Sequence, residues 1–212
     1  MQVVIVKYGA GNVYSVVHAL RRCGVEPVLT DDNDIISRAD RVIFPGQGEA
    51  ATTMQSVREQ GLDKLIPSLK QPVLGICIGQ QLMCTWSEEG GGTSCIGIFP
   101  ETRVLRFQPR SREDKIPHMG WNTVTIRKGG NADDKPAFEV SPLMEGMGVS
   151  PYFYFVHSYY VPVGSHTIAI CEYCGIPFSA AMRRNNFFAT QFHPEKSGAA
   201  GEKLLRNFLS LA

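Results

Sequence analysis

Short apolar runs alternate with helical patterns through the first half of the chain. The runs are apolar on both faces and occupy residues 3–8, 26–30, 41–46 and 72–77. Apolar residues recur at helical spacing in the segments that follow some of these runs, at residues 13–20, 50–60, 62–69 and 79–89. Strands that are apolar on both faces and separated by helices are typical of a parallel sheet covered on both sides. The first half therefore predicts an α/β fold.

The second half has a different pattern, in which strands follow one another closely. The expected strands are residues 102–107, 122–128, 152–161, 166–173, 178–182 and 187–193. Several of the intervening turns are short, so hairpins are expected here. An amphipathic helix at 201–211 closes the chain. Together the halves predict one domain over residues 1–212, with a doubly wound, mixed and mostly parallel central sheet and added antiparallel strands in the C-terminal half.

The composition narrows the class of protein. The chain has 212 residues, of which 43% are hydrophobic and 19% charged, and its formal net charge is +1. These values are typical of a globular protein, and the low net charge argues against nucleic acid or an anionic membrane as a partner. No apolar run has the roughly 20 residues that cross a bilayer. The N-terminus enters a strand pattern without the features of a signal peptide, so we expect a cytoplasmic protein.

The cysteines are expected to be reduced thiols, because disulfide frameworks are typical of short secreted chains. They lie at Cys23, Cys77, Cys84, Cys95, Cys171 and Cys174. Cys171 and Cys174 form a CxxC pair of the kind found in redox and metal sites. No second CxxC or paired histidine lies nearby in the sequence. We therefore interpret this pair as half-buried strand cysteines and predict no metal, with a redox or metal pair as the alternative.

Cys77 ends an apolar run and has a glycine two positions away on each side, Gly75 and Gly79. This arrangement matches a nucleophile elbow, a strand-to-helix turn so tight that larger flanking side chains would collide. The N-terminus of the following helix supplies partial positive charge and free N–H groups, which favour the nucleophilic thiolate. The alternative is a buried cysteine that ends a core strand. The pentapeptide alone leaves both interpretations open.

A thiolate nucleophile needs a base, and His193 is the histidine with a carboxylate placed by its local sequence. The segment His193-Pro194-Glu195 follows an expected strand. Proline disfavours the helical conformation for the residue before it, and residues two apart in an extended segment project to the same side. Glu195 can therefore hold the imidazole of His193. The alternative is a strand-end histidine followed by an ordinary turn. It is disfavoured because the same chain carries the nucleophile elbow at Cys77.

A glycine-containing turn follows the expected strand at residues 41–46. Gly46 and Gly48 flank Gln47 at the carboxyl end of this strand, the edge at which open α/β sheets bind ligands. Glycines let backbone N–H groups approach an oxyanion closely. An ordinary strand-to-helix turn is the alternative, and this pattern alone is a weak indication.

The order PGxG, GxCxGxQ and HPE resembles that of the class I (triad) glutamine amidotransferases, and the resemblance covers essentially the whole chain. It implies their flavodoxin-like fold and a glutaminase activity without a cofactor. Further segments resemble the branch of this family that serves histidine biosynthesis. These segments are residues 8–16, 117–124, 152–160 and 191–209.

The resemblance also implies roles for individual residues. Cys77 would be the nucleophile, His193 the general base and Glu195 its orienting carboxylate. The oxyanion would be held by the N–H of Ile78 and an N–H in the Gly46–Gly48 turn, at Gln47. Gly46 and Gly48 would also contribute to substrate binding. Gln81 and Glu89 would hold the substrate's amino acid end, with the backbone of Ser158 and Tyr159 beside it.

A partner is implied as well, because the chain contains no cyclase. The branch that it resembles works as a heterodimer with a cyclase subunit built as a (β/α)8 barrel, which receives the ammonia. Asn12, Met119 and Trp121 would contribute to the partner interface. A large aromatic side chain is a common interface anchor, but Trp121 as an ordinary core residue is the alternative.

Three positions depart from the pattern of the family. Lys7 stands where an acidic or small polar residue is usual, Gln47 replaces a usual valine, and Gln80 replaces a usual methionine. None of them removes a catalytic side chain. Two other functions stay open: the same glutaminase chemistry could serve a different synthetase, such as one of cell-surface sugar modification, or the chain could be a non-catalytic interaction subunit.

Overall fold

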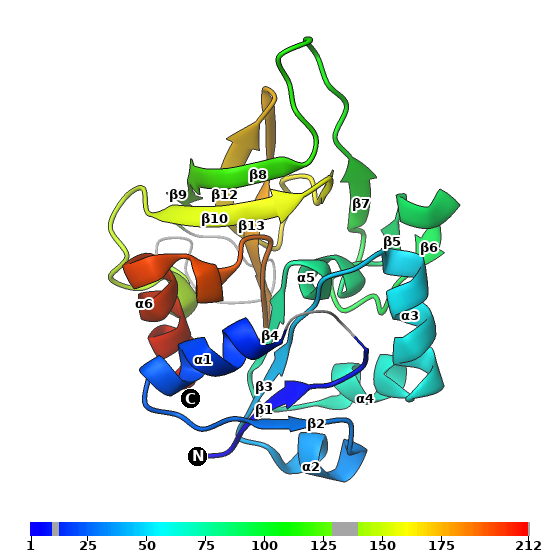
Figure 1. The fold of residues 1–212 in the computed structure, drawn as a ribbon, viewed down its shortest axis with the longest axis vertical. Coiled ribbons are helices and arrows are strands. Elements are labelled where there is room, and N and C mark those ends of the chain that lie inside the picture. Colours follow the sequence, from blue (N-terminus) through cyan, green and yellow to red (C-terminus); the bar gives the residue numbers. More distant parts are fainter. Residues whose placement is uncertain (10–12, 129–139, 212) are drawn as a thin grey trace.

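A computed structural model describes residues 1–9, 13–128 and 140–211. Its centre is one eight-stranded sheet (Figure 1). From edge to edge, the strands are β2 (Val28–Thr30), β1 (Val3–Val6), β3 (Arg41–Phe44), β4 (Val73–Ile76), β14 (Phe187–Thr190), β13 (Ile176–Arg184), β12 (Thr167–Tyr173) and β9 (Thr125–Ile126). The pairs from β2 to β14 are parallel, and those from β14 to β9 are antiparallel. The mixed sheet with a parallel centre confirms the predicted fold class.

Helices cover both faces of this sheet. One face carries α1 (Tyr14–Arg22) and α6 (Gly198–Leu209), and the other carries α2 (Asn33–Arg38), α3 (Ala50–Glu59), α4 (Leu62–Ser68) and α5 (Ile78–Leu82). The residues of strand β1 are apolar throughout because both faces of the strand are buried. Val3 and Ile5 pack in the core on the first face, and Val4 and Val6 in the core on the second, because successive side chains point to opposite faces.

Two smaller sheets and three single turns of 3-10 helix complete the described chain. One sheet pairs β10 (Tyr152–His157) with β8 (His118–Thr123), and the other has the order β11 (Tyr159–Tyr160), β7 (Arg103–Arg106), β5 (Trp86–Ser87) and β6 (Thr93–Ser94). The 3-10 turns are Glu89–Gly91, Pro142–Met144 and Pro194–Lys196. Both sheets stand at the end of the molecule toward which the parallel strands run (Figure 1).

Several elements differ from their expected bounds. The helix expected at 79–89 ends at Leu82, because the backbone of Trp86 and Ser87 pairs with β6 and β7 instead of continuing the helix. The strand expected at 122–128 is divided between the end of β8 and β9. Helix α2 lacked a clear pattern because it is short and buries only Ile36. It is capped by Asp32, whose side chain accepts from two backbone N–H groups.

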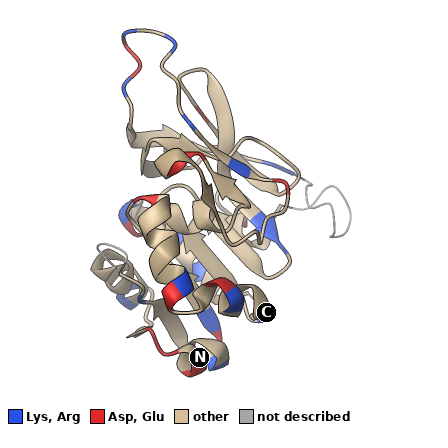
Figure 2. Cartoon of the chain, turned by 90° about the vertical axis from the view of Figure 1, so that its right-hand side faces the viewer, with Lys and Arg blue, Asp and Glu red and all other residues tan. Residues whose placement is uncertain are grey.

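Charges of both signs are interspersed along the chain in Figure 2, including on the protruding segment between β7 and β8. This distribution agrees with the net charge of +1. Within the described residues, no helix combines the length and the apolar character needed to cross a bilayer.

Candidate active site

Cys77 lies in the turn between β4 and α5. Its backbone has φ 55° and ψ −109°, and a positive φ is uncommon for residues other than glycine. The N–H of Cys77 donates to the Thr190 carbonyl of β14 at 2.7 Å. This hydrogen bond extends the pairing of β4 with β14 by one residue and holds the strained turn against the sheet. The tight turn that the sequence predicts is therefore present.

The glycines beside the elbow allow close backbone approach. A Cβ atom at Gly79 would lie 2.1 Å from the carbonyl oxygen of Phe44, on β3. A Cβ atom at Gly75 would lie 2.9 Å from the carbonyl carbon of Gly79. Both distances are far below ordinary contact. Gly79 therefore lets α5 begin directly against β3, a contact between distant segments that the sequence pattern did not indicate.

His193 and Glu195 meet as expected, but through a different local geometry. His193 Nδ1 and Glu195 Oε1 are 2.7 Å apart. The backbone of His193 is extended, as the following proline requires, whereas Glu195 lies in the 3-10 turn Pro194–Lys196. The turn, rather than projection to the same side of a strand, brings the carboxylate to the ring. Both side chains are almost completely buried.

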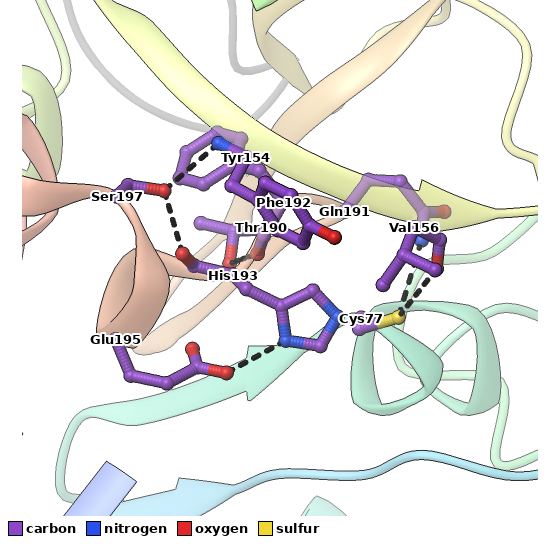
Figure 3. A network of polar contacts seen from close by, with 9 residues as sticks. All are labelled: Cys77, Tyr154, Val156, Thr190, Gln191, Phe192, His193, Glu195 and Ser197. Carbon is purple, nitrogen blue, oxygen red and sulfur yellow. Dashed lines mark hydrogen bonds and ion pairs between the residues drawn. The ribbon is translucent and has the colours of Figure 1, made fainter. Parts of the chain in front are cut away.

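Figure 3 shows the other edge of the His193 ring directed toward the sulfur of Cys77. The backbone of His193 is fixed on both sides. Its N–H donates to the Tyr154 carbonyl of β10 at 2.9 Å, and its carbonyl accepts from the Ser197 hydroxyl at 2.6 Å. The Tyr154 N–H donates to the same hydroxyl at 3.0 Å. Strand β10 and the start of α6 therefore hold the ring between sulfur and carboxylate.

The surroundings of His193 favour its protonated form. Burial by itself lowers the pKa of His193, but negative charge at Cys77 and the hydrogen bond and charge of Glu195 raise it to about 10. Within the described residues, Nε2 has no hydrogen-bond partner of ordinary geometry. A protonated imidazole beside the thiol favours the thiolate.

A pocket of about 460 Å³ opens at Cys77, a volume typical of small-molecule sites. The predicted residues that line it are Gln47, Gly48, Cys77, Ile78, Gln81, Glu89, Ser158, Tyr159 and His193. Gly46 is not among the lining residues, because it packs beneath the turn, where a Cβ atom would lie 2.0 Å from Ile78 Cγ2. The structure thus brings the three separate sequence motifs together at one cavity.

Other lining residues were not predicted: Pro117, Tyr154, Val156, His157 and Lys196. Lys196 directly follows the HPE motif, and its Nζ lies 5.9 Å from the centre of the Tyr154 ring. Position next to a catalytic motif could have indicated Lys196. The residues of β10 lie far from the motifs in sequence, and only the packing of β10 over the elbow places them here.

Glu89 presents a carboxylate to the pocket. Its Oε2 atom accepts from the N–H of Ala50 at 2.7 Å, which is the first residue of α3. The pKa of Glu89 is raised overall. Burial raises it most, the hydrogen bond from Ala50 lowers it, and the charge of the neighbouring Glu49 raises it further. The second oxygen can accept from a cationic group, such as the ammonium of an amino acid.

A pair of buried histidines lies beside the pocket. His118 Nδ1 is 3.0 Å from His157 Nε2, and His157 Nδ1 is 2.7 Å from the Tyr159 carbonyl oxygen. Since a carbonyl only accepts, His157 carries its proton on Nδ1 and accepts from His118 on Nε2. Burial lowers the pKa of His118 to about 4 and, together with the charge of other histidines, that of His157 to about 3. Both rings are neutral at pH 7.

We expect these histidines to make the fold sensitive to acid. The unfolded chain takes up their protons near the ordinary pKa of 6.5, whereas the native pair does so only near 4 and 3. Below pH 6.5 the unfolded state binds more protons, so the free energy of unfolding falls as the pH falls toward those values. Urea midpoints across this range should fall less steeply in His118→Gln than in the parent. His18→Gln, at an exposed position of α1, is the control, and equal slopes for the parent and His118→Gln would contradict the assignment.

Cys77 should react with an alkylating agent well before Cys84. Cys77 lines the pocket, while Cys84 is fully buried and burial raises its pKa to about 12. The thiolate is the reactive form, so Cys84 is both inaccessible and protonated. Peptide mapping after limited treatment with iodoacetamide measures the order. Labelling of Cys84 ahead of Cys77 would contradict the elbow.

The expected interface residues lie on the outer side of β8. The exposed fractions of Met119 and Trp121 are 64% and 51%, so the alternative of Trp121 as a core residue is wrong. The neighbouring Tyr152 of β10 is also exposed. Asn12 lies outside the described residues.

The CxxC pair is divided between two environments. Cys171 lies in strand β12, as predicted, but is buried rather than half-buried, whereas Cys174 has φ 50° in the turn before β13 and is not a strand residue. The short hairpin places the second cysteine in this turn. Both thiols are free, and no group of residues suited to hold a metal occurs in the described ranges.

Comparison with known proteins identifies the family of this chain. The model of the class-I glutamine amidotransferase family matches residues 4–211. The chain belongs to this family. An imidazole glycerol phosphate synthase subunit HisH from Bacteroides fragilis (strain YCH46) is 53% identical over 211 residues, and the Escherichia coli K12 subunit of the same name is 44% identical over 213 residues. Each comparison covers 100% of both chains.

A solved glutamine amidotransferase structure superposes with a TM-score of 0.69 at 20% identity, covering 97% of this chain and 96% of that one. This likeness supports the glutamine amidotransferase fold. Within that fold, the departures have different surroundings. Lys7 is exposed at the end of β1, Gln47 lines the pocket, and Gln80 is buried and donates to the Ser179 carbonyl at 2.9 Å.

Proposed function

We propose that this chain is the glutaminase subunit of an imidazole glycerol phosphate synthase. It hydrolyses glutamine and supplies the ammonia to a cyclase subunit in histidine biosynthesis. The observation that carries the proposal is the Cys77–His193–Glu195 arrangement at the pocket, in a chain 53% identical along its whole length to a subunit of that name. We further infer that residues 1–212 act as one glutamine amidotransferase domain, since strands from both halves form the central sheet.

In the first half of the reaction, the Cys77 thiolate attacks the side-chain carboxamide carbon of glutamine. The carbonyl π electrons move to oxygen, and a tetrahedral intermediate forms. His193, protonated beside the sulfur, gives its Nε2 proton to the departing nitrogen. The carbon–nitrogen bond breaks, ammonia leaves, and a glutamyl thioester remains on Cys77.

In the second half, neutral His193 takes a proton from water as the water oxygen attacks the thioester carbon. Collapse of this second intermediate breaks the carbon–sulfur bond and releases glutamate and the Cys77 thiolate. Glu195 keeps the proton on Nδ1 of His193, so that Nε2 faces the reacting atoms in both halves. The cycle ends with the thiolate and protonated imidazole restored.

Backbone groups of the elbow and the glycine turn would hold the oxyanion. Ile78, whose N–H would be one donor, is the first residue of α5, and Gln47 and Gly48 line the same pocket in a turn that packs against Ile78. The carboxylate of Glu89 would bind the substrate ammonium, and the Ser158–Tyr159 backbone would bind beside it. The pocket is wide enough for an amino acid of this size.

The partner would be a cyclase with a (β/α)8 barrel, docked on the surface that carries Met119 and Trp121. These exposed apolar side chains lie on β8, next to β10, whose Tyr154 and Val156 line the pocket. A barrel docked here would cover the pocket mouth and receive ammonia before it escapes into water.

The direct test is reconstitution with the candidate cyclase. The two chains together should convert the cyclase's nucleotide substrate to imidazole product with glutamine as the nitrogen source. Glutaminase activity with no product from any histidine-pathway cyclase would favour a glutaminase for a different synthetase. Absence of glutamine hydrolysis in every complex would favour a non-catalytic subunit. The intact Cys77, His193 and Glu195 argue against that outcome.

A further inference from the structure

Gln191 lies against the nucleophile and opens the 191–209 segment, but neither the sequence analysis nor the mechanism above gives its side chain a role. It follows β14 directly, is fully buried, and its Nε2 atom is 3.7 Å from the sulfur of Cys77 (Figure 3). Its backbone N–H donates to the Ala180 carbonyl at 2.9 Å, which fixes the residue to β13. Either the NH₂ group or the oxygen of this buried amide must face the sulfur.

The hydrogen bonds around Gln191 settle that orientation. Gln81 Nε2 lies 3.1 Å from the Tyr159 carbonyl oxygen and 3.0 Å from Gln191 Oε1. A backbone carbonyl only accepts, so the end of Gln81 that faces Tyr159 must be its NH₂ group. The second hydrogen of this NH₂ group then needs an acceptor, which is the oxygen of Gln191. The NH₂ group of Gln191 is thereby left facing Cys77.

The Tyr159 carbonyl is itself held in place. It accepts from His157 Nδ1 at 2.7 Å as well as from Gln81. His157 in turn accepts from His118, as described above. The orientation of the Gln191 amide is thus determined by a continuous set of buried and partly buried hydrogen bonds that ends at the sulfur.

We propose that Gln191 is a catalytic residue whose side-chain N–H donates a hydrogen bond to the Cys77 thiolate, with Gln81 and the Tyr159 carbonyl orienting the amide. The proposal rests on the glutaminase function inferred above and adds a residue to its machinery. A donor at the sulfur stabilises the thiolate relative to the neutral thiol. It therefore raises the fraction of enzyme ready to attack glutamine, and it stabilises the sulfur as a leaving group when the thioester is hydrolysed.

Gln191→Met tests the proposal, because methionine has a similar length and no N–H donor. The first readout is the rate of Cys77 alkylation by iodoacetamide across a pH range, followed on the Cys77 peptide. Loss of a hydrogen bond to a charged group should reduce the rate at neutral pH roughly ten- to hundredfold. The midpoint of the pH profile should move upward, with the limiting rate in base preserved.

Gln80→Met is the matched control. Gln80 is another fully buried glutamine, one position before Gln81, and its amide donates to the Ser179 carbonyl rather than to the sulfur. Methionine at this position should leave the alkylation profile in place. Thermal unfolding of both variants checks that neither has lost its fold. A Gln191→Met profile that coincides with the parent profile would overturn the proposal.

Gln191→Asn provides a second route if methionine prevents folding. It keeps a buried amide but withdraws the donor from the sulfur by one methylene, so the midpoint should again move upward. The Gln81→Met variant should shift it in the same direction, because the Gln191 amide loses its orienting partner. Unshifted profiles in both variants would overturn the proposal.

Enzyme kinetics separate this role from a purely structural one. In complex with the cyclase, Gln191→Met should lower the glutaminase kcat, with a smaller effect on KM, while the ammonia-dependent reaction stays at the parent level. A change in KM alone would overturn the role at the sulfur. Alkylation is measured without glutamine or partner. A failure of the proposed synthase function would therefore not change the alkylation result, and the two proposals can fail separately.

Discussion

Replacing Cys77 with alanine should abolish glutamine hydrolysis, while the complex with the cyclase should still form product from ammonium salts. The glutaminase step needs the thiolate to form the thioester, and His193 and Glu195 cannot replace that bond. The cyclase step needs only ammonia. Measured glutamate release and ammonia-dependent product formation separate the two.

Two variants provide reference points for this result. Cys84→Ala removes a buried thiol two residues beyond the end of α5 and should retain glutaminase activity in a folded complex. Glu195→Gln should lose less activity than Cys77→Ala, because an orienting carboxylate contributes less than the nucleophile. A Cys77→Ala protein with even a few per cent of the parent activity would refute the assignment. Equal losses at Cys77 and Glu195 would indicate a more direct role for Glu195.

The free chain should hydrolyse glutamine far more slowly than the complex with its cyclase and bound nucleotide. Hydrolysis without the acceptor wastes glutamine, so an oxyanion turn completed only in the complex is expected. Loss of one oxyanion donor costs roughly 2.7–4 kcal/mol, on the order of a hundred- to a thousandfold in rate. Steady-state glutaminase rates with and without the partner measure the stimulation.

The structure indicates which part of the turn can move. Gly46 is wedged against Ile78, and the Tyr8 hydroxyl donates to the Pro45 carbonyl, so the start of the turn is fixed. Gln47 and Gly48 line the pocket instead, and Gly48 has φ 149°, a conformation that favours glycine. We therefore expect the peptide between Gln47 and Gly48 to be the part of the turn that reorients when the oxyanion site is completed in the complex.

Variants at exposed apolar residues test whether the expected partner surface on β8 is needed for the stimulation. Trp121→Ala should reduce it, because Trp121 is the large exposed anchor of β8. Val149→Ser changes an exposed apolar residue outside β8 and should have no effect. If the free chain proves as fast as the complex, the partner does not activate it and the protein is a simple glutaminase.

Much of the fold could be predicted because its signals are local. The runs of β1, β3 and β4 are apolar on both faces since each face packs in a separate core. The errors occurred where distant pairing overrides local periodicity. Helix α5 ends at Leu82 because Trp86 and Ser87 pair with β7, whose residues lie well beyond them in sequence.

By itself, the sequence determined the elements that depend on neighbouring residues. The elbow at Cys77 is encoded by its two flanking glycines, and the closeness of Glu195 to His193 by their separation of two residues, although a 3-10 turn rather than an extended segment makes the contact. The glycine turn was likewise visible in the sequence, because glycine permits backbone conformations that other residues rarely adopt. The order of these motifs was sufficient to indicate the family.

Only the tertiary structure decided which distant groups complete the site. Gln191 reaches Cys77 across 114 positions because β14 pairs with β4, and His118 meets His157 across 39 because β8 pairs with β10. The strand patterns predict that such residues are buried, but not which partner each will face. Strand register sets that choice, and register results from the packing of the whole sheet rather than from any short stretch of the chain.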